Sequence, residues 1–235
     1  SLEHCERILE DYKRLEYEMH LLHNEYTGGL KLGASTTIAQ YVLPPLLASF
    51  IGKFPQVSLS LLNGNSREIE AALQEHRIDL GFVEGVFRLP NIRYTTFLED
   101  ELVAVVRTGS KLAVGEEITP DELFHLPLVL RERGSGTLDV FERALQQHNI
   151  KLSSLQVLMY LGSTESIKLF LEHTDCLGIV SVRSITRELY SGQLRVVEIK
   201  GMPMLRDFSF AQPQGQESGL AQVFMQFAMH NNHKL

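Results

Sequence analysis

The sequence predicts an α/β fold of two similar lobes that follow one long helix. In the first 26 residues, apolar side chains recur at alternating steps of three and four, which is typical of a helix with a narrow apolar seam. From residue 30 onward, short apolar segments alternate with small polar turns and helical stretches, the order typical of parallel strands covered by helices on both faces. The same order starts again near residue 126. We therefore expect two copies of one α/β plan in tandem.

Length and composition agree with an ordinary globular protein. The chain has 235 residues, of which 44% are apolar and 22% are charged, a composition unlike that of a disordered or fibrous protein. No apolar run reaches the roughly 18 residues that a transmembrane helix needs, and the start lacks the order of a secretory signal. We expect a cytoplasmic protein without a membrane partner. Because the chain has no initiator Met, we also expect a piece of a longer protein.

Charge and cysteine content exclude several functional classes. With 22 Lys and Arg against 29 Asp and Glu, the net charge is −7, so this segment is not expected to bind DNA by itself. Cys5 and Cys176 are far apart, and the chain has no Cys-x-x-Cys, which favours reduced thiols over a disulfide or a zinc site. Neither lobe carries a glycine motif for nucleotide binding. We expect no metal and no cofactor.

The first helix has the clearest local pattern. Its seam consists of Cys5, Ile8, Tyr12, Leu15, Met19, Leu22 and Tyr26. Thr27-Gly28-Gly29 ends the helix. The seam packs either on the body of its own chain or against the helix of another chain. Its narrow width and the Gly-Gly end favour the second alternative, so residues 1–28 are interpreted as a linker and dimerisation helix.

The remaining elements follow in order along the two lobes. The first lobe is expected to contain strands at 30–34, 57–62 and 78–83 and helices at 38–41, 45–53 and 67–76. The second is expected to contain strands at 126–130, 157–161 and 177–182 and helices at 138–148 and 165–173. Strands at 94–98 and 102–107 flank a predicted crossover at Glu99-Asp100-Glu101, and 194–199 with 207–212 form the return. A helix at 220–230 is expected to pack on the first lobe. These elements give lobe I as 29–103 with 208–235, and lobe II as 104–207.

Polar turns at the carboxyl ends of the strands form the candidate binding site. Ligands of open α/β sheets bind at this edge, where helix N-termini present unpaired N–H groups. The candidate residues in these turns are Ser35, Thr36, Thr37, Asn65, Glu84, Arg131, Ser135, Gly136, Thr137, Ser163 and Thr164. If the lobes face one another, several helix N-termini converge on a cleft suited to a carboxylate, sulfate or phosphate. For any single turn, the alternative is that its hydroxyl only caps a helix.

Two of these residues leave further alternatives open. Glu84 either recognises an amine, pairs with Arg131 or is a simple surface residue. Ser135 lies between two glycines, but the G-x-S-x-G spacing of a nucleophile turn is absent. We therefore expect no enzymatic activity.

Several blocks in order connect the chain with a known family. They are the long helix with Gly28-Gly29, LKLGASTTIAQYVLPPLLASFIGKFPQVSLSLLNGNSREIEAAL, IDLGFVEG, LPLVLRERGSGT and GSTESIKLFLEHTDCLGIVSV. Together they resemble the effector-binding portion of LysR-type transcriptional regulators. The resemblance covers essentially the whole chain and is specific to the family, though not to a member.

The resemblance implies two Rossmann-like lobes similar to periplasmic binding proteins, with a small-molecule effector in the interlobe cleft. It implies that three turns bind the effector: Ser35, Thr36 and Thr37; Ser135 and Thr137; and Ser163 and Thr164. It places Arg131 at a variable cleft position. It also implies a homodimer or homotetramer that pairs the helix from Pro45 with the helix from Glu165. DNA binding would belong to a winged helix-turn-helix that this chain lacks. Peroxide-sensing members use two cysteines in this region, and only Cys176 lies here, which argues against thiol sensing.

Two other functions remain as alternatives. A solute-binding protein of a transport system would have the same cleft chemistry, but it requires export and no dimerising helix. A two-lobed enzyme would require a reactive nucleophile and base in the cleft, and the sequence offers no convincing pair. The effector, the target promoter and the sign of regulation do not follow from the sequence.

Overall fold

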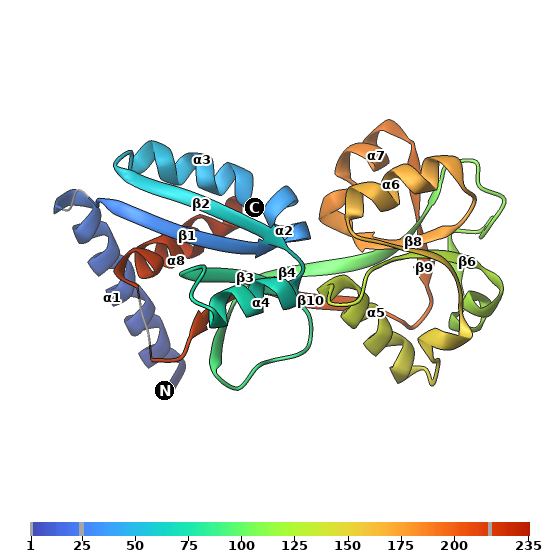
Figure 1. Ribbon diagram of the computed structural model, residues 1–235, viewed down its shortest axis with the longest axis horizontal. Coiled ribbons are helices and arrows are strands. Elements are labelled where there is room, and N and C mark those ends of the chain that lie inside the picture. The colour runs from blue at the N-terminus through green and yellow to red at the C-terminus, as the bar shows by residue number, and fades with distance from the viewer. Residues whose placement is uncertain (1, 24–25, 216–217) are drawn as a thin grey trace.

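The computed structural model describes residues 2–23, 26–215 and 218–235, and it shows two α/β lobes side by side with a helix at the outer end of the first (Figure 1). The long helix is α1 (Leu2–His23). Both predicted α/β units are present, and the fold class is confirmed. None of the described helices is long and apolar enough to cross a membrane.

Lobe I contains parallel strands with helices packed on the sheet. Its elements are β1 (Gly28–Ser35), α2 (Thr36–Tyr41), α3 (Leu43–Lys53), β2 (Val57–Gly64), α4 (Ser66–Gln74), β3 (Leu80–Glu84) and, from the end of the chain, α8 (Gly219–Asn231) and the 3₁₀ turn η4 (Asn232–Lys234). Strand β1 pairs in parallel with both β2 and β3. Helix α8 packs on lobe I as predicted, since Phe224 and Phe227 belong to the same buried cluster as Phe50 and Phe82.

Lobe II repeats this plan. Its elements are β5 (Glu117–Ile118), η1 (Pro120–His125), β6 (Pro127–Arg131), α5 (Gly136–Gln147), η2 (Leu152–Ser154), β7 (Gln156–Leu161), α6 (Thr164–His173), β8 (Leu177–Ser181), η3 (Val182–Ser184), α7 (Thr186–Ser191) and β9 (Leu194–Ile199). Strand β6 pairs in parallel with both β7 and β8. The sequence did not predict β5, α7 or the 3₁₀ turns. They have two to six residues each, too few to show a period of their own.

Two long antiparallel strands join the lobes. Strand β4 (Ile92–Arg107) pairs with β10 (Met204–Pro213) along its first part, and with β8 and β9 further on. The strands therefore form one sheet in the order β2-β1-β3-β10-β4-β8-β6-β7. Strand β9 pairs with β4 and β5 outside this order. The prediction of two short strands around Glu99-Asp100-Glu101 was wrong. The crossover lies there, but the strand continues through it because Asp100 is buried and lies opposite Arg206.

Each lobe has its own hydrophobic core. The buried clusters of lobe I include Phe208, whereas a buried cluster of lobe II includes Met204 from the same strand. This change of core along β10 supports the predicted lobe boundaries, which stay a prediction.

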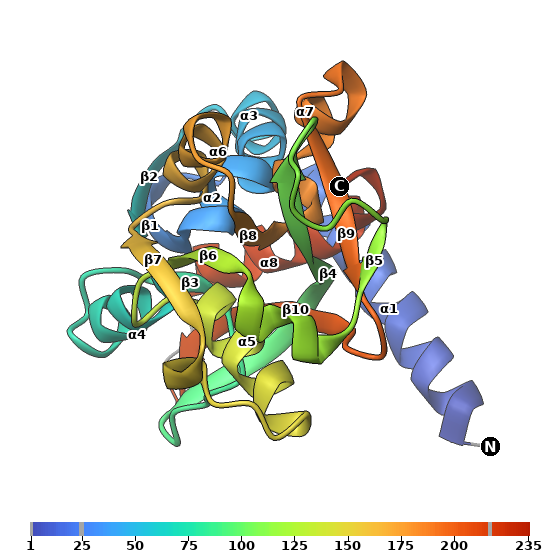
Figure 2. The same cartoon turned by 90° about the vertical axis from the view of Figure 1, so that its right-hand side faces the viewer.

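Helix α1 extends away from the rest of the protein (Figure 2), and among its described side chains only that of Tyr17 is buried. Tyr17 is buried, and its ring lies 5.6 Å from the ring of His230. The seam points elsewhere: Ile8, Tyr12, Leu15 and Met19 are all more than half exposed. The side chain of Leu22 lies outside the described residues. The seam is therefore uncovered in a single chain as far as Met19. Its last predicted member, Tyr26, lies beyond the end of α1 and packs on its own chain, with its ring 5.5 Å from that of Phe54.

Candidate functional site at the interlobe junction

The predicted polar turns meet where the lobes touch. We call this region the junction; it comprises the carboxyl ends of β1, β3 and β6 and the first residues of α2, α5 and α6. At its centre, Ser35 Oγ donates a 2.8 Å hydrogen bond to Glu84 Oε2, and Thr137 Oγ1 from lobe II lies 3.4 Å from Glu84 Oε1. Glu84 is therefore buried between the lobes. The hydroxyl-bearing turns converge rather than scatter over the surface.

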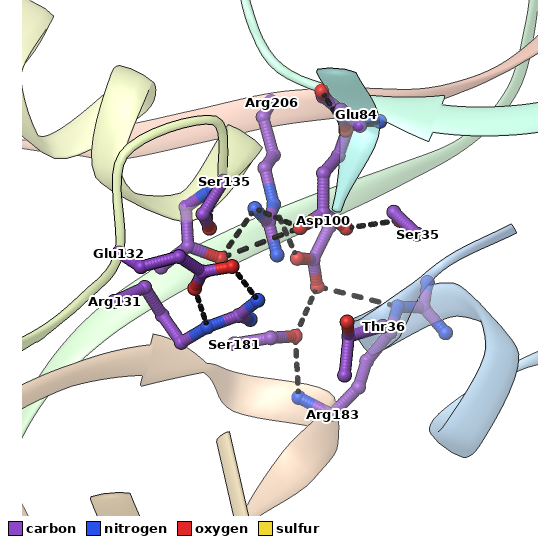
Figure 3. A network of polar contacts seen from close by, with 12 residues as sticks. Ser35, Thr36, Glu84, Asp100, Arg131, Glu132, Ser135, Ser181, Arg183 and Arg206 are labelled. Atoms are coloured by element: carbon purple, nitrogen blue, oxygen red, sulfur yellow. Dashed lines mark hydrogen bonds and ion pairs between the residues drawn. The ribbon is translucent and has the colours of Figure 1, made fainter. Parts of the chain in front are cut away.

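Glu84 pairs with an arginine, but not with the one considered from the sequence. Arg206 Nη1 lies 3.3 Å from Glu84 Oε1, and Arg206 Nε donates to Asp100 Oδ2 at 2.8 Å. Arg206 Nη1 also donates to Thr137 Oγ1 at 3.0 Å. The possible pairing of Glu84 with Arg131 is wrong, because Arg206 on the crossing strand is inserted between the two acids (Figure 3). Buried carboxylates need such partners, since an unpaired buried charge is strongly destabilising.

Asp100 extends this network into the second lobe. Ser181 Oγ donates to Asp100 Oδ1 at 2.8 Å, and Arg183 Nε lies 3.4 Å from the same oxygen. Figure 3 shows how these groups surround the crossing strands. The crossover is therefore held by buried charges whose partners come from both lobes.

Arg131 lies in the junction with a different partner. Its side chain is 1% exposed, and its Nε donates to Glu132 Oε1 at 2.9 Å. Asn65 of lobe I donates from Nδ2 to Glu132 Oε2 at 3.3 Å. The remaining nitrogen, Arg131 Nη1, is buried without a hydrogen-bond partner among the described residues. Arg131 therefore offers one free, buried, positively charged donor.

Thr36 and Thr37 of α2 differ in how their hydroxyls are used. Thr36 Oγ1 donates to the Gly64 carbonyl at 3.1 Å. Thr37 is fully buried, and its Oγ1 has no partner among the described residues. The charge of Arg131 acts on Tyr41, which lies on the same helix as Thr37. The two unpartnered groups thus come from different lobes, with Arg131 at the end of β6 and Thr37 in α2.

The serines that begin α5 and α6 cap their own helices. Ser135 Oγ accepts from the Thr137 amide at 3.1 Å, and Ser163 Oγ accepts from the Ser166 amide at 3.1 Å. Capping, the alternative kept open from the sequence, is thus observed for both. Thr164, the first residue of α6, is buried. Asn65 also caps, in a capping box with Glu68 that the sequence analysis overlooked.

Helix α6 contacts lobe I through the residue after this turn. Tyr41 donates a hydrogen bond to Glu165 Oε1, and Lys168 Nζ lies 2.8 Å from the same oxygen. Burial opposes ionisation of Glu165, but these two hydrogen bonds outweigh it and hold its pKa below the usual range. Burial and the bond to Glu165 raise the pKa of Tyr41. The lobes are therefore bonded on this side as well.

Gly136 brings the backbones of the two lobes together. A Cβ atom at this position would lie 2.4 Å from both Cγ and the carbonyl oxygen of Glu84. Only glycine fits, which explains why the turn between Ser135 and Thr137 contains one.

Sequence reasoning missed Glu132, Asp100, Ser181 and Arg206. Asp100 lies in the predicted crossover and Arg206 lies one residue before the predicted strand at 207–212, so neither could be singled out from a local pattern. Glu132 lies beside the predicted site residue Arg131. Three buried donor atoms of the junction have no hydrogen-bond partner among the described residues: Arg131 Nη1, Arg206 Nη2 and Thr37 Oγ1. All three can donate to an oxyanion. Among the described residues, no group of three or more His, Cys, Asp and Glu is arranged to hold a metal.

Comparison with known proteins gives consistent matches. The family model described as LysR substrate binding domain matches residues 23–232. A protein of Escherichia coli K12, named as the uncharacterized HTH-type transcriptional regulator YeiE, is 35% identical over 182 residues, which cover 77% of this chain and 61% of that protein. The chain thus spans less than two thirds of that relative.

Solved structures show the same fold. The CcmR regulatory domain of Synechocystis PCC6803, in complex with 2-PG, has a TM-score of 0.78 at 28% identity, with 87% of this chain and 97% of that domain covered. The effector-binding domain of QuiR, in complex with shikimate, also has a TM-score of 0.78, at 19% identity, with 89% of this chain and 99% of that domain covered.

Proposed function

This chain belongs to the family of LysR substrate-binding domains, and we propose that its effector is a small oxyanion bound at the junction. The general function, effector binding in a transcriptional regulator, follows from the family and from relatives of that kind. The class of ligand and its position are our proposal. The predicted turns Ser35 to Thr37, Ser135 to Thr137 and Ser163 to Thr164 would form the walls, with Arg131 as the charged group.

One observation carries this proposal. Arg131 Nη1 and Thr37 Oγ1 are buried polar atoms without hydrogen-bond partners among the described residues. Leaving such a group unsatisfied costs about 1–3 kcal/mol, and more when it is charged. A carboxylate, sulfate or phosphate oxygen would satisfy both. The CcmR domain, which is 28% identical, was solved with 2-PG, and this supports a small-molecule ligand for the present chain.

The effector would act through the arrangement of the lobes. Bonds such as Tyr41 to Glu165 and Asn65 to Glu132 join lobe I to lobe II at the junction. A ligand that binds one lobe arrangement better than another shifts the population by its differential affinity. We propose that this shift reorients the subunits of a dimer or tetramer.

Subunit pairing and DNA binding are parts of the same proposal. The exposed seam of α1 and the exposed side chains of Ile51 on α3 and Leu169 on α6 support a homo-oligomer that uses these helices. The relative named above is longer than this chain and is named as an HTH-type regulator. With its net charge of −7, the present chain would leave DNA binding to a separate domain. We place such a regulator in the cytoplasm, where the DNA is.

The alternative of a solute-binding protein has less support. Neither the matched family nor YeiE is of that class. An enzymatic role also has no support in the junction, where the serines at 135 and 163 cap helices and have no histidine partner in the described contacts.

Ligand binding at the junction can be tested by thermal unfolding with sulfate, phosphate and small carboxylates at constant ionic strength. A ligand at 100 times its Kd adds about 2.7 kcal/mol of stability, which corresponds to a Tm increase of about 5–10 °C for a chain of this size. Thr37→Ala and Arg131→Lys should reduce the increase, because each removes one of the unpartnered donors. Ser153→Ala, at an exposed position of lobe II, is the control and should retain it. An increase that survives both junction variants would show that the ligand binds elsewhere.

A further inference from the structure

We infer that Glu132 determines how strongly the junction binds an oxyanion, because it is a built-in counter-ion that shares Arg131 with the effector. This inference rests on the proposed function and deepens it, since it names the residue that sets the charge preference of the site. Glu132 was not among the residues expected to bind the effector.

The carboxylate of Glu132 pairs with most of the guanidinium group of Arg131. Glu132 Oε1 accepts from Arg131 Nε at 2.9 Å, and Glu132 Oε2 lies 3.5 Å from Arg131 Nη2. Two of the three guanidinium nitrogens therefore face the carboxylate, and only Nη1 is free. An effector oxygen must approach end-on at Nη1 unless it displaces Glu132.

The two side chains differ in exposure, which matters for their roles. The Arg131 side chain is 1% exposed, whereas that of Glu132 is 30% exposed. A buried guanidinium needs a negative partner, and Glu132 supplies it for Arg131. Because Glu132 has access to water, it can move away at less cost than Arg131 can. A bound oxyanion would therefore compete with Glu132 for the same positive charge.

Glu132 is also tied to the opposite lobe. Asn65, the N-cap of α4 in lobe I, donates to Glu132 Oε2 at 3.3 Å. The Arg67 amide donates to the Gly134 carbonyl at 3.4 Å in the same turn. The contact of the lobes thus helps to hold Glu132 against Arg131. It follows that separating the lobes weakens the ion pair between Glu132 and Arg131. Conversely, an oxyanion bound to Arg131 weakens the hydrogen bond between Asn65 and Glu132.

The charges of Arg131 and Glu132 determine whether the site prefers monoanions or dianions. Arg131 and Glu132 together carry no net charge, so a dianion at Nη1 meets a nearby carboxylate without a surplus positive charge. A monoanion meets the same carboxylate with half the repulsion. Glu132 should therefore weaken the binding of dianions more than that of monoanions.

The test is calorimetric titration of Glu132→Gln with sulfate and with acetate at pH 7.5 and constant ionic strength. Glutamine keeps the size and an acceptor oxygen but removes the negative charge. We expect sulfate to bind at least tenfold more tightly than to the unchanged protein, with a smaller gain for acetate. Asn65→Ser keeps a capping hydroxyl for α4 and removes the donor to Glu132, so it should give an intermediate gain. Asp121→Asn, at an exposed position of the same lobe, removes an equal charge and should give none.

The outcomes separate this inference from the proposed function. Sulfate binding that requires Thr37 and Arg131 but is unchanged or weaker in Glu132→Gln overturns the inference and leaves the function intact. An equal gain in Asp121→Asn, or no sulfate binding by Glu132→Gln, overturns it as well. Sulfate binding that depends on neither Thr37 nor Arg131 contradicts the proposed function itself. Should Glu132→Gln fail to fold, Asn65→Ser decides, since the absence of any gain there overturns the inference.

Discussion

Burial changes the pKa of individual side chains in this protein, as it does for the thiol of Cys176. It is 1% exposed, and burial raises the pKa of its thiol to about 11, with the charge of Asp175 acting in the same direction. The thiolate is the reactive form, so this shift lowers the fraction of reactive thiolate at neutral pH. The expectation against thiol sensing stays a prediction.

Glu70 on α4 gives a prediction for the pH dependence of stability. Burial raises its pKa, although a hydrogen bond from Tyr94 acts in the opposite direction. The pKa of the folded state therefore lies above the unfolded value of about 4.3. The stabilising contribution is complete below the unfolded pKa and is lost as the pH rises through the folded pKa.

Glu70→Gln should remove this loss, because the amide keeps an acceptor for Tyr94 and carries no charge. Urea unfolding at pH 4, 5.5 and 7 measures it. Relative to the unchanged protein, the variant should gain stability as the pH rises. Glu75→Gln, at an exposed position beyond the end of α4, is the control. Parallel stability curves for the Glu70 variant and the unchanged protein would contradict the assignment.

At the residue level, the sequence predicted where polar groups gather but not how they pair. Ser35, Glu84 and Thr137 do meet, because parallel strands end at one edge. The partner of Glu84 could not be predicted, since Arg206 is distant in sequence and reaches the site only through the crossing strand. Their roles in effector binding stay a prediction.

Among the elements, the first turn of α5 fixes how closely the lobes approach. Gly136 lies against Glu84 with no room for a side chain. Gly136→Ala should lower the free energy of unfolding by about 1–3 kcal/mol, the usual range for overpacking, or force the lobes apart. Thermal unfolding measures the first effect, and the radius of gyration from X-ray scattering measures the second.

Gly52 on α3 is a matched control for this substitution. A Cβ atom there has no neighbour within 4 Å, so Gly52→Ala should stabilise the helix by about 0.5–1 kcal/mol. If Gly136→Ala behaves in the same way, the close contact with Glu84 does not exist in solution.

Most elements were predictable because each has a period and a turn of its own. Strand β4 could not be predicted as one continuous strand, because the acidic run at 99–101 has the composition of a loop. Its continuity depends on the cross-strand pair of Asp100 and Arg206, which no local pattern shows. The buried ion pair therefore overrode the local preference.

For the whole molecule, the seam of α1 predicts self-association. Ile8 is 67% exposed and Leu15 is 55% exposed, and such a stripe on a helix is usually covered by another helix. We expect the chain to sediment as a dimer, and Ile8→Glu with Leu15→Glu should shift it to a mass of 26.6 kDa.

Tyr190→Glu tests whether any exposed apolar residue would have this effect. Tyr190 is 96% exposed on α7, away from the seam, and its replacement should leave the dimer intact. A monomeric unchanged protein, or self-association that the double variant does not weaken, would show that the seam is not a subunit contact.

The pairing of β4 with β10 limits how the lobes can move. A hinge made of loops could swing widely, but here the connection is a hydrogen-bonded ribbon with a register shift at Phe208/Ser209. Its ladder is preserved only if motion occurs as a change of twist. An effector signal would therefore reach α1 as a small rotation of lobe II relative to lobe I. The angle of this rotation could vary continuously, whereas a flexible loop between the lobes would transmit no defined rotation.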